Sequence, residues 1–333
     1  ITKELIDLVG INHNDYSKIH FKDYLKATTP AFPIMNMQQD KIAVIVAKGT
    51  ILDGTQKSGT IGGDSTARLL RKARLNKKVK AVVLRVDSPG GSAFASDIIR
   101  QEIELIKAAG KPVVASMGTY AASGGYWISA PADKIIASPT TITGSIGIFG
   151  FFMTFENSLS KLGIHTDGVG TTDLAGFGVT RPLNAGMAKI FQLGIERGYQ
   201  DFIELVANNR DLSLSEVDAI AQGRVWSGVK AKELGLVDSL GNLNDAIDEA
   251  AKLANLSDYG TLLIEKDKST QDIFLQSLLG QSSKLFAIES FATQSNKGPF
   301  DEMLLSLKQQ YKSINQLNDP QGIYSFCLVC DLD

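Results

Sequence analysis

Ser123 is the side chain of this sequence best placed to act as a nucleophile, because of what stands on either side of it. The apolar segment 112–117 precedes it and predicts a strand, and the run 121–126 around it leads into a predicted helix. A serine at such a turn exposes its oxygen, while nearby backbone N–H groups and the helix dipole stabilise negative charge on a substrate carbonyl. The sequence therefore favours acyl transfer to serine, although Ser-Gly-Gly is also found in ordinary turns.

A second predicted strand end supplies the glycines that this chemistry needs. The apolar run 81–86 ends in Asp-Ser-Pro-Gly-Gly-Ser, residues 87–92, before another helical pattern. Because glycine has no Cβ, main-chain N–H groups there can approach an oxyanion at a distance that larger residues would block. We expect the N–H groups at Gly91 and Gly124 to form an oxyanion hole; for each glycine alone, a plain turn is the alternative.

Three segments together closely resemble the signal peptide peptidase A family, the protease IV group of serine peptidases. They are residues 87–92, 117–126 and 143–147. Two later segments resemble the family's late structural motif, and two more resemble the tail of its long bacterial form: residues 223–228, 235–238, 318–320 and 326–330. The resemblance extends from about residue 40 to the C-terminus.

The resemblance implies an α/β fold similar to those of Clp protease and crotonase, with a repeated β-β-α core and peripheral helices. It also implies a Ser-Lys dyad in place of a Ser-His-Asp triad, with Ser123 as the nucleophile. Ser145 stands at the position of the family's second serine, which hydrogen-bonds and orients the general-base lysine. That lysine must be neutral to accept a proton, so it needs a desolvated site that lowers its pKa.

The resemblance places the base outside this chain. In short members of the family the lysine lies in a Gly-x-Tyr-Lys-like stretch shortly before an arginine, and Leu174 falls at that position ahead of Arg181. No lysine occurs between Lys161 and Lys189, so a small shift of the alignment does not restore it. This pattern resembles the C-terminal half of the long form, whose N-terminal half supplies the lysine. We expect the isolated chain to have little or no peptidase activity without that half, and Leu174 to remain a candidate for lining the cleft.

The resemblance also implies the substrates, which are remnant signal peptides cleaved after signal peptidase has released them. Such peptides are apolar, so we expect an apolar specificity pocket. Its candidate residues follow Ser145, and burial in the core is the alternative role for each of them. They are Ile146, Ile148, Phe149, Phe151 and Phe152.

Assembly and location are expected from the same resemblance. It implies a homo-oligomeric ring or bowl, with a tetramer expected, at the periplasmic face of the bacterial inner membrane. No apolar run here reaches the roughly 18 residues that cross a bilayer, and the family's anchor lies in the N-terminal part of the long form. Ile1, in place of methionine, is interpreted as a processing or truncation point.

Composition excludes some classes of function. With 333 residues and 44% hydrophobic content the chain can form a substantial core. A net charge of −2 gives no electrostatic footprint for nucleic acid, and the basic residues between positions 68 and 80 are typical of a solvated helix face. Cys327 and Cys330 are too few for a structural zinc site, so we expect no metal or cofactor; a disulfide between them stays open.

The elements that position these residues alternate between strands and helices, which predicts parallel strands with helices packed outside. Residues 1–40 are interpreted as an N-terminal linker from the missing half, residues 41–255 as the peptidase domain, and residues 256–333 as a C-terminal helical extension and tail. Asp64 is expected to cap a helix, and a helix over 184–209 carries an apolar stripe that we expect to be buried in the core or against a subunit. The other predicted strands are 41–47, 80–87, 112–118 and 134–138, and the other predicted helices are 93–109, 123–131, 214–222, 228–234, 243–254, 269–280 and 299–315.

Two other classes of function stay open. A crotonase-like acyl-CoA hydratase or isomerase also uses two backbone N–H groups for an oxyanion, but it works through glutamates placed near those donors. A catalytically silent assembly module would use the long helix and the C-terminal segment for subunit contacts. A Ser-His-Asp triad would depend on His165, which is interpreted as a surface or hydrogen-bonded residue.

Overall fold

The computed structural model of the protein describes residues 11–12, 15–16, 19, 40–57, 59–172, 174–266 and 317–330. Its contacts divide the chain into two compact units, Ile1–Gln38 and Gln39–Asp333. In the first unit, β1 (Ile11–Asn12) pairs antiparallel with β2 (Asp15–Tyr16). All further elements belong to the second unit, and the helices expected over 269–280 and 299–315 lie outside the described residues.

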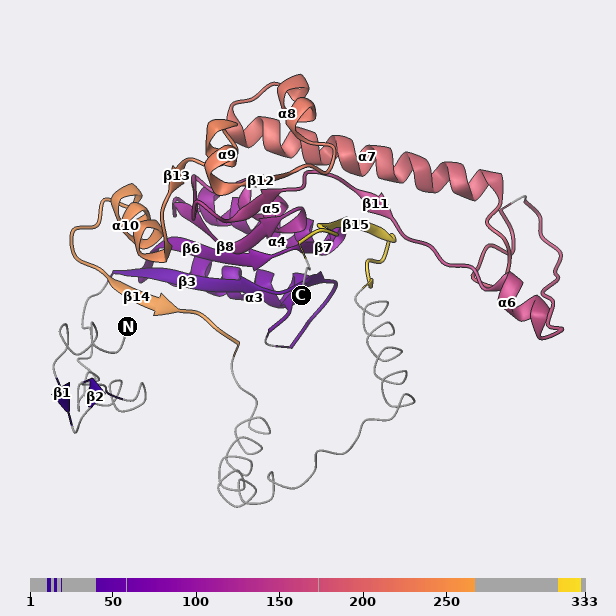
Figure 1. Ribbon diagram of the computed structural model, residues 1–333, viewed down its shortest axis with the longest axis horizontal. Helices are drawn as coiled ribbons and strands as arrows, with labels where there is room; N and C mark the ends of the chain where they lie inside the picture. Colours follow the sequence, from indigo (N-terminus) through magenta and orange to yellow (C-terminus); the bar gives the residue numbers. More distant parts are fainter. Residues whose placement is uncertain are drawn as a thin grey trace, which may run out of the picture. The chain divides into compact units, whose positions relative to one another are not determined.

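An eight-stranded, mostly parallel sheet forms the centre of the second unit (Figure 1). Along its main path the strands follow the order β12-β10-β8-β6-β3-β14, and β9 pairs with both β8 and β13. Only the β10–β12 pair is antiparallel. The strands are β3 (Lys41–Lys48), β6 (Val79–Ser88), β8 (Val113–Ala122), β9 (Lys134–Ala137), β10 (Ile142–Gly144), β12 (Val225–Ser227), β13 (Ser239–Leu240) and β14 (Gly260–Leu263).

Both faces of this sheet are covered, which explains why its central strands are apolar almost throughout. On one face, Val82 and Leu84 of β6 join a core with Ile99 of helix α4 (Ala93–Ala108). On the other face, Val83 packs in a separate core with Ala250 of helix α10 (Leu243–Leu253). The alternation follows from the two-residue period of a strand, and it confirms the α/β class expected from the sequence.

A second, five-stranded sheet lies beside the first and has the order β11-β15-β7-β4-β5. Its strands are β4 (Ile51–Leu52), β5 (Ile61–Gly62), β7 (Gly90–Ser92), β11 (Phe149–Gly150) and β15 (Ile323–Phe326). β7 follows β6 directly in the chain, whereas β15 comes from the C-terminal segment. This sheet therefore joins parts of the chain that are far apart in sequence.

The predicted helices that fall on described residues are present, with one correction at a helix start. Helix α3 (Gly63–Leu75) has Gly62 as its N-cap, with extended backbone angles, and Asp64 lies in the first turn instead of at the cap. A carboxylate in the first turn still interacts favourably with the helix dipole. The remaining helices are α5 (Gly124–Ser129), α6 (Glu156–Lys161), α7 (Ala185–Arg210), α8 (Leu214–Ile220) and α9 (Gly228–Glu233).

Only the C-terminal part of α7 is fully buried in the core. Of the expected apolar stripe, Phe202 and Val206 are fully buried, whereas the members nearer the start of the helix are half-buried, and their burial against a subunit stays a prediction. Ile190 and Leu193, which lie beside that stripe, are 49% and 54% exposed. In Figure 1 this first half of α7 extends beyond the edge of the central sheet toward α6, in which no residue is buried. We call the region formed by residues 151–195 the arm.

Candidate functional site

Three neighbouring strands end side by side and bring the sequence motifs to one edge of the central sheet. β6, β8 and β10 are parallel neighbours, with Ser88 opposite Ala121 and Gly144 opposite Ala122. The residues just beyond these strand ends therefore meet, as is usual at the carboxyl ends of parallel strands. They are Gly90, Gly91, Ser123 and Ser145.

Ser123 occupies the turn between β8 and α5 in a conformation that only its surroundings can hold. Its φ is 54° and its ψ is −115°, and it is the N-cap residue of α5. Its N–H donates to the Gly144 carbonyl at 2.8 Å, and its carbonyl accepts from the Trp127 N–H at 2.8 Å. A non-glycine residue with positive φ costs about 1–3 kcal/mol, and such strain at a strand-to-helix turn is typical of a nucleophilic serine.

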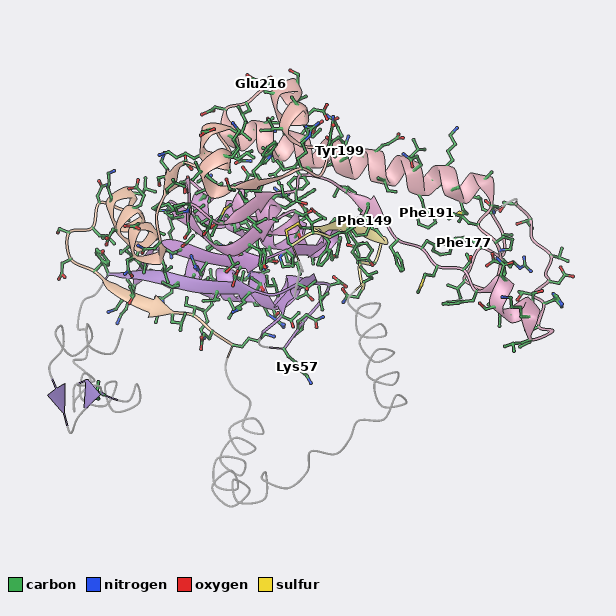
Figure 2. The ribbon with its side chains drawn as sticks, viewed as in Figure 1. Lys57, Phe149, Phe177, Phe191, Tyr199 and Glu216 are labelled. Carbon is green, nitrogen blue, oxygen red and sulfur yellow. A yellow bond between two sulfur atoms is a disulfide. The ribbon has the colours of Figure 1, made fainter. Side chains whose placement is uncertain are left out.

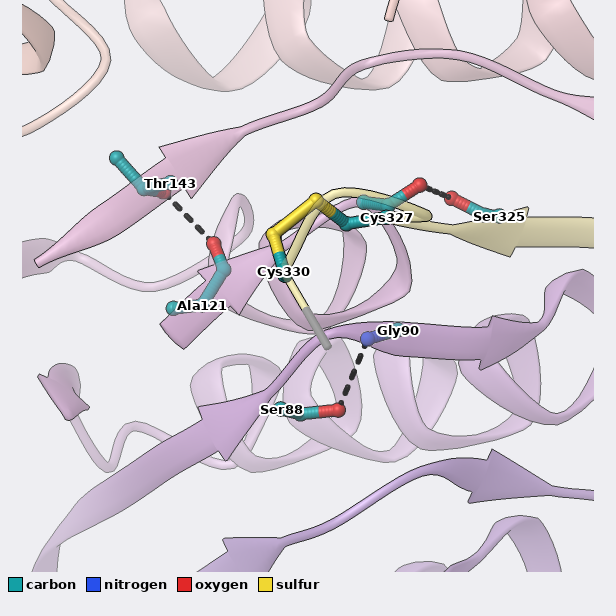
Figure 3. Close-up of a disulfide and its surroundings, with 8 residues drawn as sticks. Ser88, Gly90, Ala121, Thr143, Ser325, Cys327 and Cys330 are labelled. Carbon is teal, nitrogen blue, oxygen red and sulfur yellow. Dashed lines mark hydrogen bonds between the residues drawn. A yellow bond between two sulfur atoms is a disulfide. The ribbon is translucent and has the colours of Figure 1, made fainter. Parts of the chain in front are cut away.

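Ser145 lies directly beside Ser123 because β10 and β8 run in register. Its φ is 50°, and its N–H donates to the Arg224 carbonyl at 2.7 Å. The Thr143 hydroxyl donates to the Ala121 carbonyl at 2.7 Å and fixes β10 against β8 just before the two serines (Figure 3). Both serines are buried, and both line the same cavity.

The glycines beside Ser123 are required by close backbone contacts. A Cβ on Gly91 would lie 1.9 Å from the Ile51 carbonyl oxygen, and a Cβ on Gly90, whose φ is 101°, would lie 2.6 Å from the Gly124 nitrogen. The Gly90 N–H donates to the Ser88 hydroxyl at 3.1 Å (Figure 3). The backbone of β7 thus lies against the start of α5, and the donor role of the N–H groups at Gly91 and Gly124 stays a prediction.

A cavity of about 310 Å³ opens at the two serines. Of the five expected pocket residues, Ile148 and Phe149 line it. Ile146 is fully buried in the main core, and Phe151 is 37% exposed. The structure therefore brings two of the five candidates to the cavity at Ser123.

Phe152, the fifth candidate, belongs to an aromatic cluster in the arm. Its ring centroid lies 4.9 Å from that of Phe177 and 5.4 Å from that of Phe191. Figure 2 shows Phe177 and Phe191 facing one another between the outer part of α7 and the segment below it, beyond Phe149. The cluster holds the arm together, and Phe152 does not line the cavity.

Several lining residues were not foreseen from the sequence because they come from distant parts of the chain. Tyr199 is contributed by α7 and Gln222 by the loop after α8, and the C-terminal segment contributes three apolar side chains. The sequence marked the C-terminal segment as a motif, but no local pattern indicates that it lies against Ser123. The three side chains are Phe326, Leu328 and Val329.

The C-terminal segment also supplies a hydrogen-bond partner for Ser123. The Ser325 and Ser123 hydroxyl oxygens are 2.9 Å apart, and Ser325 is fully buried. Cys327 and Cys330 form a disulfide (Figure 3). It packs against Ala122, the residue before Ser123. The disulfide that the sequence left open is therefore present in the structure.

Among the described residues, those that line this cavity include no lysine, histidine, aspartate or glutamate. The one titratable side chain there is Tyr199, which donates to Asp218 at 2.7 Å; burial and then this hydrogen bond raise the pKa of Tyr199 to about 12. Tyr199 is therefore protonated at neutral pH and cannot serve as the base. Leu174 lies next to Gly186 of α7 and is 40% exposed, and His165 is exposed. Neither residue lines the cavity.

A larger cavity of about 640 Å³ lies between α4 and α7. Several of its charged side chains form ion pairs, including Arg100 with Asp97 and Arg197 with Asp201. Ser123 and Ser145 do not line it. The described residues hold no cluster of His, Cys, Asp and Glu able to bind a metal ion, and none of their helices has the length and apolar character that a bilayer crossing needs.

Comparisons with known proteins find relatives of this chain among peptidases. The family described as Peptidase family S49 matches residues 106–257. The chain is 46% identical over 319 residues to "Protease 4" of Salmonella typhi, covering 95% of this chain and 50% of that protein. It is 35% identical to a putative protease of Synechocystis sp. over 228 residues, covering 68% of this chain and 78% of that protein.

A solved structure of a ClpP1 mutant from Listeria monocytogenes is similar to 61% of this chain and 94% of that chain, with a TM-score of 0.41 and 19% identity. The chain spans about half the length of the curated Protease 4 relatives that it matches.

Proposed function

The chain belongs to peptidase family S49, the signal peptide peptidase A or protease IV group, and on that premise we propose that it supplies the nucleophile and oxyanion donors of a Ser-Lys endopeptidase. The observation that carries the proposal is the shared cavity at Ser123 and Ser145, whose described lining residues hold no base. The base is then a lysine from the N-terminal half of the longer protein. The same proposal includes the division of the sequence into three parts, with residues 1–40 as an N-terminal linker from that half.

The proposed reaction begins with attack by the Ser123 hydroxyl oxygen on the scissile carbonyl carbon. The serine proton moves to the neutral lysine amine, which Ser145 orients through its hydroxyl. N–H groups at Gly91 and Gly124 stabilise the tetrahedral oxyanion, and its collapse breaks the C–N bond as the lysine returns the proton to the leaving amine. Water then hydrolyses the acyl-enzyme by the same two steps and restores the serine.

Apolar signal-peptide remnants suit the lining of the cavity. Outside the C-terminal segment, Ile148 and Phe149 give this lining an apolar character, and no carboxylate lies among the described lining residues. The missing carboxylate leaves the glutamate-based chemistry of acyl-CoA hydratases without support here. The proposal needs no cofactor or metal.

We further propose that the complete protein is a homo-oligomer, a ring or bowl that is expected to be tetrameric, with its sites inside. It acts at the periplasmic face of the bacterial inner membrane, where an anchor outside this chain holds it. A half of length similar to this chain remains in the Protease 4 relatives, which leaves room for both the lysine and the anchor.

Substituting the nucleophile in the complete protein tests this function. Ser123→Ala should lower kcat/KM for a Leu-rich peptide by at least about 10³-fold, because removal of a nucleophile leaves only binding and oxyanion stabilisation. The matched control is Ser160→Ala, since Ser160 is exposed on α6. Retention of proteolysis by the Ser123→Ala protein would show that this part of the protein is an assembly module.

A further inference from the structure

The strand β15 fills a slot between β7 and β11. It pairs antiparallel with β7, with Ser325 opposite Gly91, and antiparallel with β11, with Tyr324 opposite Phe149. The other edge of β7 pairs with β4 at Ile51. Both edges of β7 are therefore occupied, so a peptide that adds a strand beside it has no free backbone groups to pair with.

This slot passes directly in front of the nucleophile. The Ser325 hydroxyl lies 2.9 Å from the Ser123 hydroxyl (Figure 3). A Cβ on Gly90 would lie 2.2 Å from the Ser325 carbonyl oxygen and 2.6 Å from the Gly124 nitrogen, so that oxygen lies close to the predicted oxyanion donor at Gly124. The tail thus places a peptide carbonyl beside one of the two proposed oxyanion donors.

Hydrogen bonds and packing hold the tail in the slot. The Asp319 carboxylate accepts hydrogen bonds from the Ser92 hydroxyl at 2.5 Å and from the Phe94 N–H at 3.1 Å, and the Cys327 N–H donates to the Pro89 carbonyl at 2.8 Å. The disulfide joins two residues of the tail to one another. Within the described residues, no covalent bond other than the chain itself fixes β15 to the body.

We propose that β15 is an intramolecular occupant of the substrate groove: an extended peptide binds between β7 and β11 only when the tail leaves. The sequence Tyr324-Ser325-Phe326 then represents what the groove accepts, a small residue at the nucleophile with aromatic residues on either side. The identity of the groove rests on the proposed function. The test measures binding, so that it does not depend on hydrolysis.

A reversible lock on the tail provides this test. Gly150 and Ile323 are paired across β11 and β15, and a Cβ on Gly150 would meet only the flexible end of Ile195 within 3.4 Å. The full chain carries Gly150→Cys and Ile323→Cys, with Cys327→Ser and Cys330→Ser to prevent other disulfides. Oxidation should join the tail to β11, and reduction should release it in the same protein.

The probe is a fluorescent peptide with the sequence of residues 321–326, and its anisotropy reports binding. The apparent Kd equals the intrinsic Kd divided by the fraction of protein whose groove is open, so the oxidised protein should bind at least about tenfold more weakly than the reduced protein. The same peptide with tryptophan in place of its serine should bind more weakly to the reduced protein, because Ser325 is fully buried. The background with only the two Cys→Ser changes should bind equally in both redox states.

Equal affinity in the oxidised and reduced states overturns the proposal, as does a failure of the reduced protein to bind. Failure of the two introduced cysteines to join in a folded protein, found by mass spectrometry, also contradicts it. Adding Ser123→Ala to the chain with the introduced cysteines separates the proposal about the tail from the proposal of peptidase activity. Redox-dependent binding there supports the tail as occupant even if hydrolysis is never found, while equal binding rejects it and leaves the peptidase proposal standing.

Discussion

At the scale of single residues, the turn at Ser123 depends on backbone contacts that leave no room for side chains. Ser123 holds a positive φ because β10 and α5 bond its N–H and its carbonyl. Gly90 lies between the Gly124 nitrogen and the Ser325 carbonyl oxygen, with no room for a methyl group. The conformation of the turn at Ser123 is therefore maintained by the packing of the chain segments around it.

Gly90→Ala tests this packing. Its positive φ alone should cost about 1–2 kcal/mol of unfolding free energy, and the overlap with two backbone atoms should add about 1–3 kcal/mol. Gly59→Ala is the matched control, because Gly59 has a similar φ of 91° and nothing within 4 Å of its Cβ position. Urea unfolding of both variants measures the difference, and equal losses would mean that the contacts at Gly90 do not constrain the turn.

At the scale of elements, the sequence predicts what local pattern determines. β6, α4 and β8 were found from their apolar periodicity, because burial on both faces of the sheet produces that pattern. β14 and β15 were not predicted as strands. Each has four residues, and the partners that make them strands, β3 and β7, lie about 200 residues away. The pocket was predicted only in part, since the chain leaves regular structure after β10 and Ile146 turns into the core while Ile148 reaches the cavity.

The two halves of α7 should differ in their contribution to stability. Phe202→Ala removes a fully buried ring whose centroid lies 4.6 Å from that of Trp127, and it should cost about 3–5 kcal/mol. Leu193→Ala, on the exposed half of the same helix, should stay within about 0.5 kcal/mol in the isolated chain. Chemical unfolding measures the loss of unfolding free energy in each variant. A large loss for Leu193→Ala would indicate that the arm is buried against another subunit.

The last turn of α7 is tied to the sheet by an ion pair that depends on pH. Arg210 lies 3.0 Å from the Asp238 carboxylate, which also accepts the Ile135 N–H at 2.7 Å. Burial alone would raise the pKa of Asp238, but the hydrogen bonds from Arg210 and Ile135 and the charges of Arg210 and Lys134 outweigh it and lower that pKa.

Asp238→Asn should therefore cost about 1–3 kcal/mol of unfolding free energy at pH 7. A lowered folded-state pKa gives stability that is present above the unfolded value of about 3.9 and is lost as the pH falls through the folded value. The difference between the two proteins should stay constant from pH 7 to 5 and shrink below about pH 4. Asp201→Asn, which breaks a more exposed pair with Arg197, is the control and should cost about 1 kcal/mol or less. A difference for Asp238→Asn that grows in acid would contradict this assignment.

At the scale of the whole molecule, the proposal makes this chain one part of a divided active site. Two buried serines, Ser123 and Ser145, line one cavity, and no base is among its described lining residues. The chain also spans half of its Protease 4 relatives. The exposed apolar side chains of the arm, such as Leu162 and Val169, are available for contacts with the remainder of the assembly.

The most direct measurement is the rate at which a fluorophosphonate probe acylates Ser123, with and without the N-terminal half. The account predicts slow labelling of the chain alone and an increase of about 10²–10⁴-fold when the half that carries the lysine is added, the range that a general base contributes. Mass spectrometry should place the label on Ser123. Rapid labelling of Ser123 in the chain alone, unchanged by the second half, would contradict the central claim that the base lies outside this chain.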